Sequence, residues 1–212
     1  LVWCFNGIGS QWPGMAADLM KIPLFADSIE KCHQILAKEN FDLKKVVTRS
    51  DEKFENVLSS YAGIVAVEIA LVNVLKSVGL EPDFMIGHSL GEIGVAYADN
   101  CLTLEEAILV AFERGRACNE SKNIHGAMAA VGVGHEELQK ILPHDIDIAC
   151  HNSSDLSTIT GPYDSIQKFM QDLSAKGIFA KEVQSSGIAL HSRYISEYAQ
   201  LYYKSIEKVI KN

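Results

Sequence analysis

The chain has 212 residues, of which 48% are hydrophobic and 22% are charged. This composition supplies enough apolar residues for a sizeable core, and the length favours one domain or one domain with an inserted subdomain. The net charge of −8 and the pI of about 5.3 argue against a general nucleic-acid-binding or anionic-membrane surface.

Three features of the sequence indicate the cellular compartment of the protein: its cysteines, its apolar runs and its first residues. Five cysteines, an odd number without metal-ligand spacing, predict reduced thiols in the cytoplasm and no metal site. The longest apolar stretch, residues 62–75, contains Glu68 and Asn73 and is too short to span a bilayer. The opening residues predict a strand rather than a signal peptide. Because the chain lacks an initiator Met and enters secondary structure at once, we interpret it as a piece of a longer polypeptide.

The first half of the chain predicts a strand, two helices and a second strand. A strand over residues 2–5 runs into a glycine loop, residues 6–11, and helices are expected within 15–37 and over 64–78. Gly79 ends the second helix, and Pro82 opens the next strand. The sequence Gly87-His88-Ser89-Leu90-Gly91 then follows, with a helical pattern directly after it.

That pentapeptide predicts a nucleophile elbow, in which a serine lies on a sharp strand-to-helix turn. The two glycines permit the tight backbone, and the hydroxyl of Ser89 is exposed above the sheet. The backbone N–H of Leu90 would point toward an oxyanion that forms on the substrate. The motif indicates acyl chemistry, but it does not say whether water or another carrier accepts the acyl group.

The next helix, residues 103–119, places a cation on its apolar side. Thr103 and Glu106 have the spacing of a capping box. Helical periodicity puts Arg114 on the apolar face and Glu113 off it. A guanidinium on such a face needs an anionic partner. By the pattern alone a structural ion pair is favoured over a substrate carboxylate, and both remain open.

From Gly126 the pattern changes to short strands and helices. Strands are expected over 127–133, 145–151, 157–161 and 178–183, with helices over 134–142 and 164–176. The order β-α-β-β-α-β is that of the ferredoxin-like split motif. We therefore predict an α/β protein: an α/β-hydrolase-like core formed by residues 1–123 and 188–212, with a ferredoxin-like subdomain, 124–187, inserted into it. A terminal helix is expected over 194–210.

A serine nucleophile needs a base, and His191 is the best candidate among seven histidines. It follows Ser89 in the chain order of elbow enzymes, and it lies where the chain re-enters the core. No Asp or Glu between them is singled out as a third member, so a Ser-His dyad is preferred to a triad. The glycine loop offers a second oxyanion donor, the backbone N–H of Ile8.

Four features together resemble a known family. They are Gly7-Ile8-Gly9-Ser10-Gln11-Trp12, Gly87-His88-Ser89-Leu90-Gly91-Glu92, Arg114 and Ala189-Leu190-His191-Ser192. In this order and spacing the chain resembles the acyltransferase domain of type I fatty acid synthases and related polyketide synthases. It is most similar to the malonyl/acetyltransferase domain of animal fatty acid synthase, and the likeness runs over essentially the whole chain.

The resemblance implies a ping-pong acyl transfer. Ser89 would attack the thioester of malonyl-CoA or acetyl-CoA while His191 takes its proton, and Ile8 and Leu90 would form the oxyanion hole. Arg114 would pair with the free carboxylate of malonate, with His88 and Leu190 also at the substrate. The acceptor would be the phosphopantetheine thiol of an acyl carrier protein, beside synthase domains such as a ketosynthase. Coenzyme A would be a substrate carrier, with no bound cofactor and no metal.

Three departures from the family's pattern matter. Bacterial malonyl transferases carry Gln where Ile8 stands, although animal synthases also have an apolar residue there. Leu190 precedes His191 where malonyl-specific members often carry Phe, which leads to the hypothesis that methylmalonyl-CoA is tolerated. The family also continues well beyond Asn212, with further strands and helices of the large subdomain and a backbone carbonyl that orients the histidine.

Two alternatives remain at this point. One is a serine esterase or thioesterase that uses the same elbow; a core-facing Arg114 and the missing triad acid argue against it. The other is a truncated fragment without catalysis that serves as a scaffold or binding surface.

Overall fold

The computed structural model describes residues 1–51, 54, 56–120 and 125–210, which form two compact units. The first comprises Leu1–Asn119 and Tyr202–Asn212, and the second comprises Glu120–Leu201. Each unit has its own hydrophobic core.

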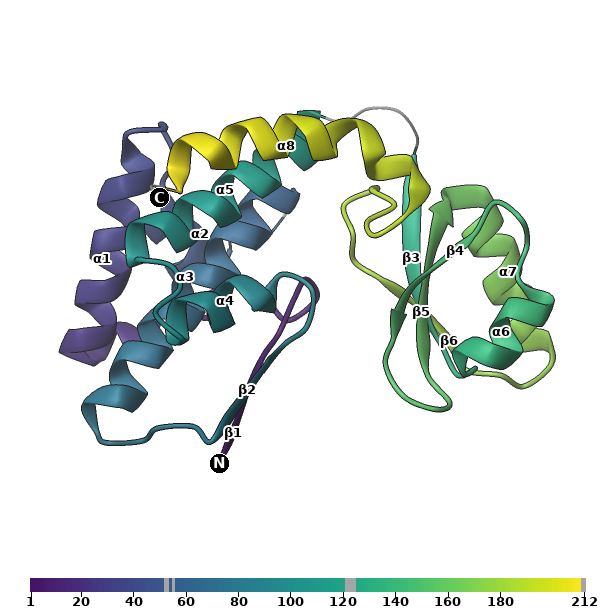
Figure 1. Cartoon of the computed structure of the whole chain (residues 1–212), viewed down its shortest axis with the longest axis horizontal. Coiled ribbons are helices and arrows are strands. Elements are labelled where there is room, and N and C mark those ends of the chain that lie inside the picture. The colour runs from purple at the N-terminus through teal and green to yellow at the C-terminus, as the bar shows by residue number, and fades with distance from the viewer. Residues whose placement is uncertain (52–53, 55, 121–124, 211–212) are drawn as a thin grey trace. The chain divides into compact units, whose positions relative to one another are not determined.

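The first unit combines a pair of strands with a set of helices (Figure 1). Strands β1 (Val2–Phe5) and β2 (Phe84–Gly87) pair in parallel, with Val2 opposite Phe84 and Phe5 opposite Gly87. The helices around α3 are α1 (Pro23–Ala37), α2 (Leu43–Thr48), α4 (Gly91–Ala98), α5 (Leu104–Glu120) and the 3-10 turn η1 (Leu19–Lys21). Helix α3 (Val57–Ser77) packs against α1, α2 and α4, and α5 also contacts it, so α3 is the central element.

Local sequence explains how these helices begin and end. The Asn56 side chain accepts a hydrogen bond from the N–H of Ser59 at 2.9 Å, so α3 begins seven residues earlier than the apolar pattern predicted. The predicted capping box of α5 is present: Thr103 N–H donates to the Glu106 carboxylate at 2.9 Å, and Glu106 N–H donates to Thr103 Oγ1 at 3.2 Å. Gly79, at φ +76°, follows α3 in the left-handed region.

Helix α3 has the length and hydropathy that would suffice to cross a membrane. Within the structure, however, 61% of its apolar window is buried against other elements. This burial is that of a core helix.

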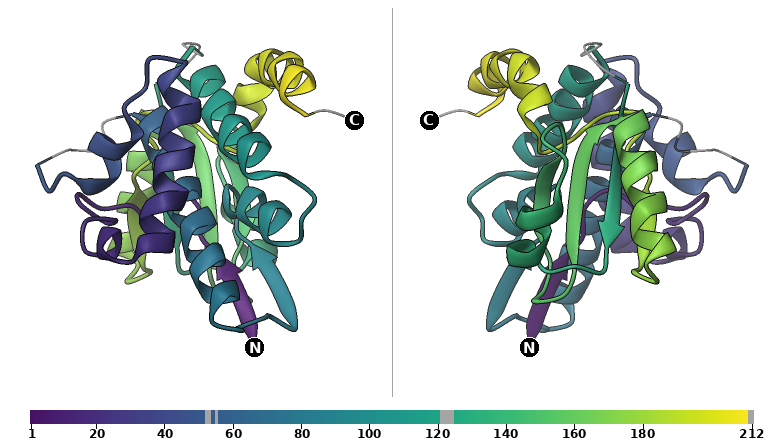
Figure 2. Two further views of the ribbon diagram at one scale, coloured as in Figure 1. Left: turned by 90° about the vertical axis from the view of Figure 1, so that its left-hand side faces the viewer. Right: turned by 90° about the vertical axis from the view of Figure 1, so that its right-hand side faces the viewer.

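The second unit is a four-stranded antiparallel sheet with the order β4-β5-β3-β6. Its elements follow in the expected order β-α-β-β-α-β. Helices α6 and α7 cover one face of the sheet (Figures 1 and 2), where Leu138 and Phe169 join Ala129, Val131 and Ile159 in one core. The bounds are β3 (Gly126–Val131), α6 (His135–Ile141), β4 (Asp147–His151), β5 (Ser157–Pro162), α7 (Tyr163–Ala175) and β6 (Ala180–Val183).

The second unit extends further along the chain than the predicted boundary at residue 187. Residues 188–201 group with it, and the chain returns to the first unit at Tyr202, within helix α8 (Ser196–Val209). Hydrogen bonds explain the difference. The N–H of Gly126 donates to Gly187 O at 2.8 Å, and the N–H of Arg193 donates to the carboxylate of Asp147 at 2.9 Å. These contacts attach the segment, including the 3-10 turn η2 (Arg193–Ile195), to strands β3 and β4 of this sheet.

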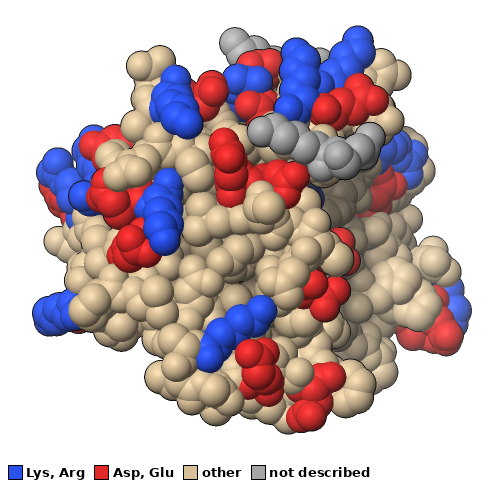
Figure 3. All heavy atoms as spheres, turned by 60° about the vertical axis from the view of Figure 1, so that its left-hand side comes forward, with Lys and Arg blue, Asp and Glu red and all other residues tan. Residues whose placement is uncertain are grey.

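Charges of both signs are interspersed on the surface. On the face shown in Figure 3, Lys and Arg lie among Asp and Glu, with a broad uncharged area between them. That face carries no continuous basic stripe of the kind that a nucleic-acid backbone requires.

Candidate active site

The turn after β2 has the geometry of a nucleophile elbow. Ser89 has a φ of 56°, in the left-handed region that a serine rarely occupies. The turn is held by hydrogen bonds from the N–H of His88 to Phe5 O at 2.9 Å and from the N–H of Gly91 to His88 O at 3.0 Å. Helix α4 starts directly after it, so a helix N-terminus lies beside the serine. Backbone strain at a polar residue of this kind is typical of functional sites.

Both glycines of the elbow are required by close contacts. A Cβ on Gly91 would lie 2.2 Å from Phe5 O, and one on Gly87 would lie 2.5 Å from the backbone nitrogen of Glu92. Neither atom belongs to a side chain that can move aside. The sequence pattern therefore reflects how closely strand β1 and helix α4 approach the turn.

The glycine loop after β1 packs directly against the elbow. A Cβ on Gly7 would lie 2.8 Å from His88 O and 3.4 Å from the backbone nitrogen of Leu90. Side chains of the loop fix its shape, since Ser10 Oγ donates to Gly7 O at 2.9 Å and Gln11 Oε1 accepts from the N–H of Gly9 at 2.8 Å. The segment that carries Ile8 thus lies beside Leu90, and the role of both residues in an oxyanion hole stays a prediction.

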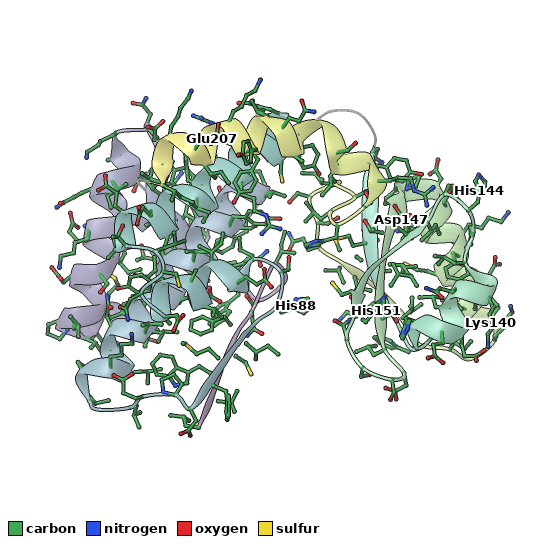
Figure 4. The ribbon with its side chains drawn as sticks, viewed as in Figure 1. His88, Lys140, His144, Asp147, His151 and Glu207 are labelled. Atoms are coloured by element: carbon green, nitrogen blue, oxygen red, sulfur yellow. The ribbon has the colours of Figure 1, made fainter. Side chains whose placement is uncertain are left out.

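Leu90 and His88 take different positions in the elbow. The Leu90 side chain is fully buried, and its residue is the N-cap of α4 with helical dihedral angles. The backbone hydrogen bonds of the turn are donated by the N–H groups of His88, Gly91, Glu92 and Ile93. His88 lies at the turn after β2 (Figure 4), next to the predicted nucleophile.

Helix α5 differs from the prediction at two neighbouring residues. Glu113, expected off the apolar face, is only 7% exposed and pairs with Arg116 at 2.6 Å. Arg114, expected on that face, is half-buried. The buried side of α5 is wider than a single helical stripe, and the Arg116 guanidinium compensates the charge of Glu113 where it enters the core.

Within the described part of the chain, Arg114 has an aromatic neighbour and no acidic partner. Its guanidinium carbon lies 5.4 Å from the centroid of the Tyr61 ring. Among the residues that the structure describes, no Asp or Glu forms an ion pair with Arg114. The structural ion pair that the sequence pattern favoured is therefore not found among the described residues.

His191 lies in the second unit, in the segment that follows β6. Its φ is 56°, so both predicted catalytic residues are among the few non-glycine residues with a left-handed backbone. Tight packing holds the segment: Leu190 is 3% exposed, and a Cβ on Gly126 would lie 2.4 Å from the backbone nitrogen of Ala189. Ser89, Ile8, Leu90, His88 and Arg114 belong to the first unit, so the pairing of Ser89 with His191 stays a prediction.

The sequence interpretation missed Glu68, a carboxyl group behind the glycine loop. Its Oε2 is buried and lacks a hydrogen-bond partner among the described residues, and a Cβ on Gly94 of α4 would lie 2.6 Å from it. Burial raises the pKa of Glu68 to about 8, and a hydrogen bond from the backbone of Asn6 offsets part of this rise. A lone acid in the otherwise apolar stretch 62–75 was the signal available in the sequence.

A cavity of about 390 Å³ lies between β1 and α3 in the first unit. Glu68, Ser10 and Trp12 line it together with apolar residues of both elements. Neither Ser89 nor Arg114 is among its lining residues, so this cavity is separate from the elbow. Within the described residues, no group of three or more His, Cys, Asp or Glu side chains is arranged to hold a metal ion.

Known protein sequences match this chain over nearly its whole length. Residues 2–212 match the sequence model of the acyl transferase domain. The highly reducing polyketide synthase rstn3 of Aspergillus nomiae is 33% identical over 99% of the chain, and the reducing polyketide synthase DEP5 of Fusarium langsethiae is 34% identical over 92%. In each case the chain spans only 9% of the relative's length.

Solved structures show the same fold. The acyl transferase domain of SpnD, in complex with 2-(pent-4-yn-1-yl)malonyl, has a TM-score of 0.89 at 23% identity, covering 99% of this chain and 50% of that one. The malonyl CoA-acyl carrier protein transacylase of Coxiella burnetii has a TM-score of 0.87 at 24% identity, covering 98% and 68%. At these identities the likeness concerns the α/β fold alone.

Proposed function

This chain belongs to the acyl transferase domain family, and we propose that it moves malonyl and acetyl groups from coenzyme A to the thiol of an acyl carrier protein. The elbow at Ser89 carries the proposal. A serine in a left-handed turn, between two glycines at which a Cβ would meet backbone atoms and at the start of a helix, is arranged for attack on an acyl carbon.

The proposed reaction has two half-reactions through one covalent intermediate. Ser89 Oγ attacks the thioester carbonyl as His191 accepts its proton, and the backbone N–H groups of Ile8 and Leu90 stabilise the oxyanion. The tetrahedral intermediate collapses, the C–S bond breaks, and the coenzyme A thiolate takes the proton from His191. The phosphopantetheine thiol of the carrier protein then attacks the acyl-serine in the same manner, which restores the Ser89 hydroxyl.

Arg114 is proposed to select malonyl over acetyl groups. A half-buried guanidinium without an acidic partner in the described chain is suited to a bidentate pair with a substrate carboxylate. His88 and Leu190 are proposed to line the acyl site. The smaller Leu190 leads us to propose that methylmalonyl-CoA is also accepted; steady-state kinetics showing methylmalonyl turnover at background level would exclude it.

The wider context is also a proposal. The motifs of the sequence resemble animal fatty acid synthase, whereas the relatives described above are fungal polyketide synthases. We propose that the chain acts in the cytoplasm within a multidomain synthase that makes fatty acids, beside a ketosynthase and an acyl carrier protein. Analysis of the acyl products of the complete polypeptide separates fatty acid synthesis from polyketide synthesis.

Hydrolysis is the competing activity on the same elbow. A hydrolase of neutral acyl groups has no use for Arg114, and the family match is to transferases. The test compares two acceptors for labelled malonyl-CoA in the purified full chain: water, and an acyl carrier protein that carries phosphopantetheine. We expect the label on the carrier protein at a rate well above release of free malonate, and no transfer by the Ser89→Ala variant. Free malonate as the main product would support the hydrolase.

A further inference from the structure

The guanidinium of Arg114 is half-buried, so neighbouring groups must stabilise its charge. Taking a guanidinium out of water without an anionic partner is costly. Among the described residues, two tyrosine side chains of the first unit, Tyr61 and Tyr202, interact with this guanidinium, and no carboxylate pairs with it. The Tyr61 ring on α3 lies 5.4 Å from the guanidinium carbon, and the charge of Arg114 also acts on Tyr202 of α8.

Both phenols stay neutral beside the cation. Burial raises the pKa of Tyr61 and of Tyr202, and the nearby Arg114 charge offsets only part of this rise. Neither group therefore supplies a counter-ion. Cys118, one turn further along α5, is also buried. The Arg114 cation thus has two neutral phenols beside it.

Tyr61 contributes its ring and not its hydroxyl. The residue is 1% exposed, and its Oη atom is buried without a hydrogen-bond partner among the described residues. A cation over an aromatic face is attracted by the negative potential of the ring. This attraction offsets part of the desolvation cost, yet a ring face is not a conventional acceptor that would occupy the guanidinium N–H donors.

We propose that Tyr61 is a positioning residue for carboxylate selectivity: its ring holds the Arg114 guanidinium in place and leaves the N–H donors available for the malonyl carboxylate. The inference rests on the proposed malonyl transfer. An acidic residue in the place of Tyr61 would neutralise Arg114 and compete with the substrate. An aromatic ring anchors the cation without that competition.

The test varies the ring at position 61 and measures kcat/KM for malonyl-CoA and acetyl-CoA in the full chain. Tyr61→Leu removes the ring, and we expect malonyl transfer to fall about 3- to 30-fold relative to acetyl transfer, mainly through KM. Tyr61→Phe keeps the ring and should restore the wild-type ratio. Phe169→Leu, in the core of the second unit, controls for general destabilisation and should leave the ratio unchanged.

A series of phenylalanines with one, two and three ring fluorines at position 61 covers the case in which Tyr61→Leu does not fold. Fluorine weakens the negative face of the ring at nearly constant shape, so the malonyl-to-acetyl ratio should fall stepwise. A ratio that stays flat across the series, or an equal loss for both substrates in Tyr61→Leu, would overturn the proposal. If Arg114→Ala itself changes both substrates equally, the proposed function of Arg114 is wrong instead.

Discussion

The two units carry different shares of the predicted chemistry. The first holds five of the seven predicted site residues: four lie in the elbow and the adjoining glycine loop, where backbone atoms approach closely, and Arg114 lies within helix α5. The second is an antiparallel sheet with one apolar core, and it supplies His191 and Leu190 from a segment fixed at its edge. The first unit has close backbone contacts at the elbow, whereas the predicted base in the second unit lies in a segment outside its strands and helices.

The largest expected effect is the loss of the histidine from the second unit. His191→Ala should lower the rate of Ser89 acylation about 10²- to 10⁴-fold, because a general base is removed. Rapid-quench measurement of acyl-enzyme formation checks this. The exposed His144→Ala, in the same unit, is the matched control and should keep the wild-type rate. An unchanged rate in His191→Ala would show that this histidine of the second unit takes no part in the acylation of Ser89.

Next in size is the effect of Arg114 on substrate choice. Arg114→Ala should lower kcat/KM for malonyl-CoA about 10- to 100-fold more than for acetyl-CoA, because charge-assisted hydrogen bonds to the carboxylate are lost. Arg116→Ala is the control on the same helix. This substitution leaves the carboxylate of Glu113 buried without its partner. It should therefore lower stability without changing the ratio of kcat/KM for malonyl-CoA to that for acetyl-CoA.

A smaller effect is expected on stability when the elbow is crowded. Gly91→Ala should destabilise the first unit by about 1–3 kcal/mol or more, since the added methyl group meets Phe5 O. Hydrogen exchange resolved by peptide should show faster exchange in β1 and α4 and little change in β3 to β6. Gly79→Ala, where a Cβ meets nothing within 4 Å, tests left-handed strain alone and should cost about 1 kcal/mol. Equal losses in both units would contradict separate cores.

The smallest effect concerns pH. Because the pKa of Glu68 is raised to about 8 in the folded chain, folding favours the protonated form. The stability contributed by this group is present below the unfolded pKa of about 4 and is lost as pH rises toward 8 and above. Urea midpoints at pH 6 and pH 9 should therefore differ less in Glu68→Gln than in wild type. The exposed Glu81→Gln should show the wild-type difference, and an unaltered difference in Glu68→Gln would refute the assignment.

The sequence predicted features that depend on near neighbours. The elbow, the capping box of Thr103 and Glu106, and the order of strands and helices after Gly126 follow from short-range patterns, and the structure has them. Helical periodicity ranked Arg114 above Glu113 for burial and was wrong, because burial on α5 also depends on its neighbours, such as Leu58 of α3 against Gly115. Glu68 was missed for a related reason: only the fold brings Asn6 and Gly94 to its carboxyl group.

In the proposed reaction, Ser89 carries the acyl group from coenzyme A to the acyl carrier protein. The most direct measurement is mass spectrometry of the full chain after incubation with malonyl-CoA and acid quenching, with peptide mapping of the modified residue. We predict one malonyl group per chain on Ser89, its removal by an acyl carrier protein that carries phosphopantetheine, and none on the Ser89→Ala variant. An acyl group on another residue, or an unmodified Ser89 in a folded chain, would contradict the account.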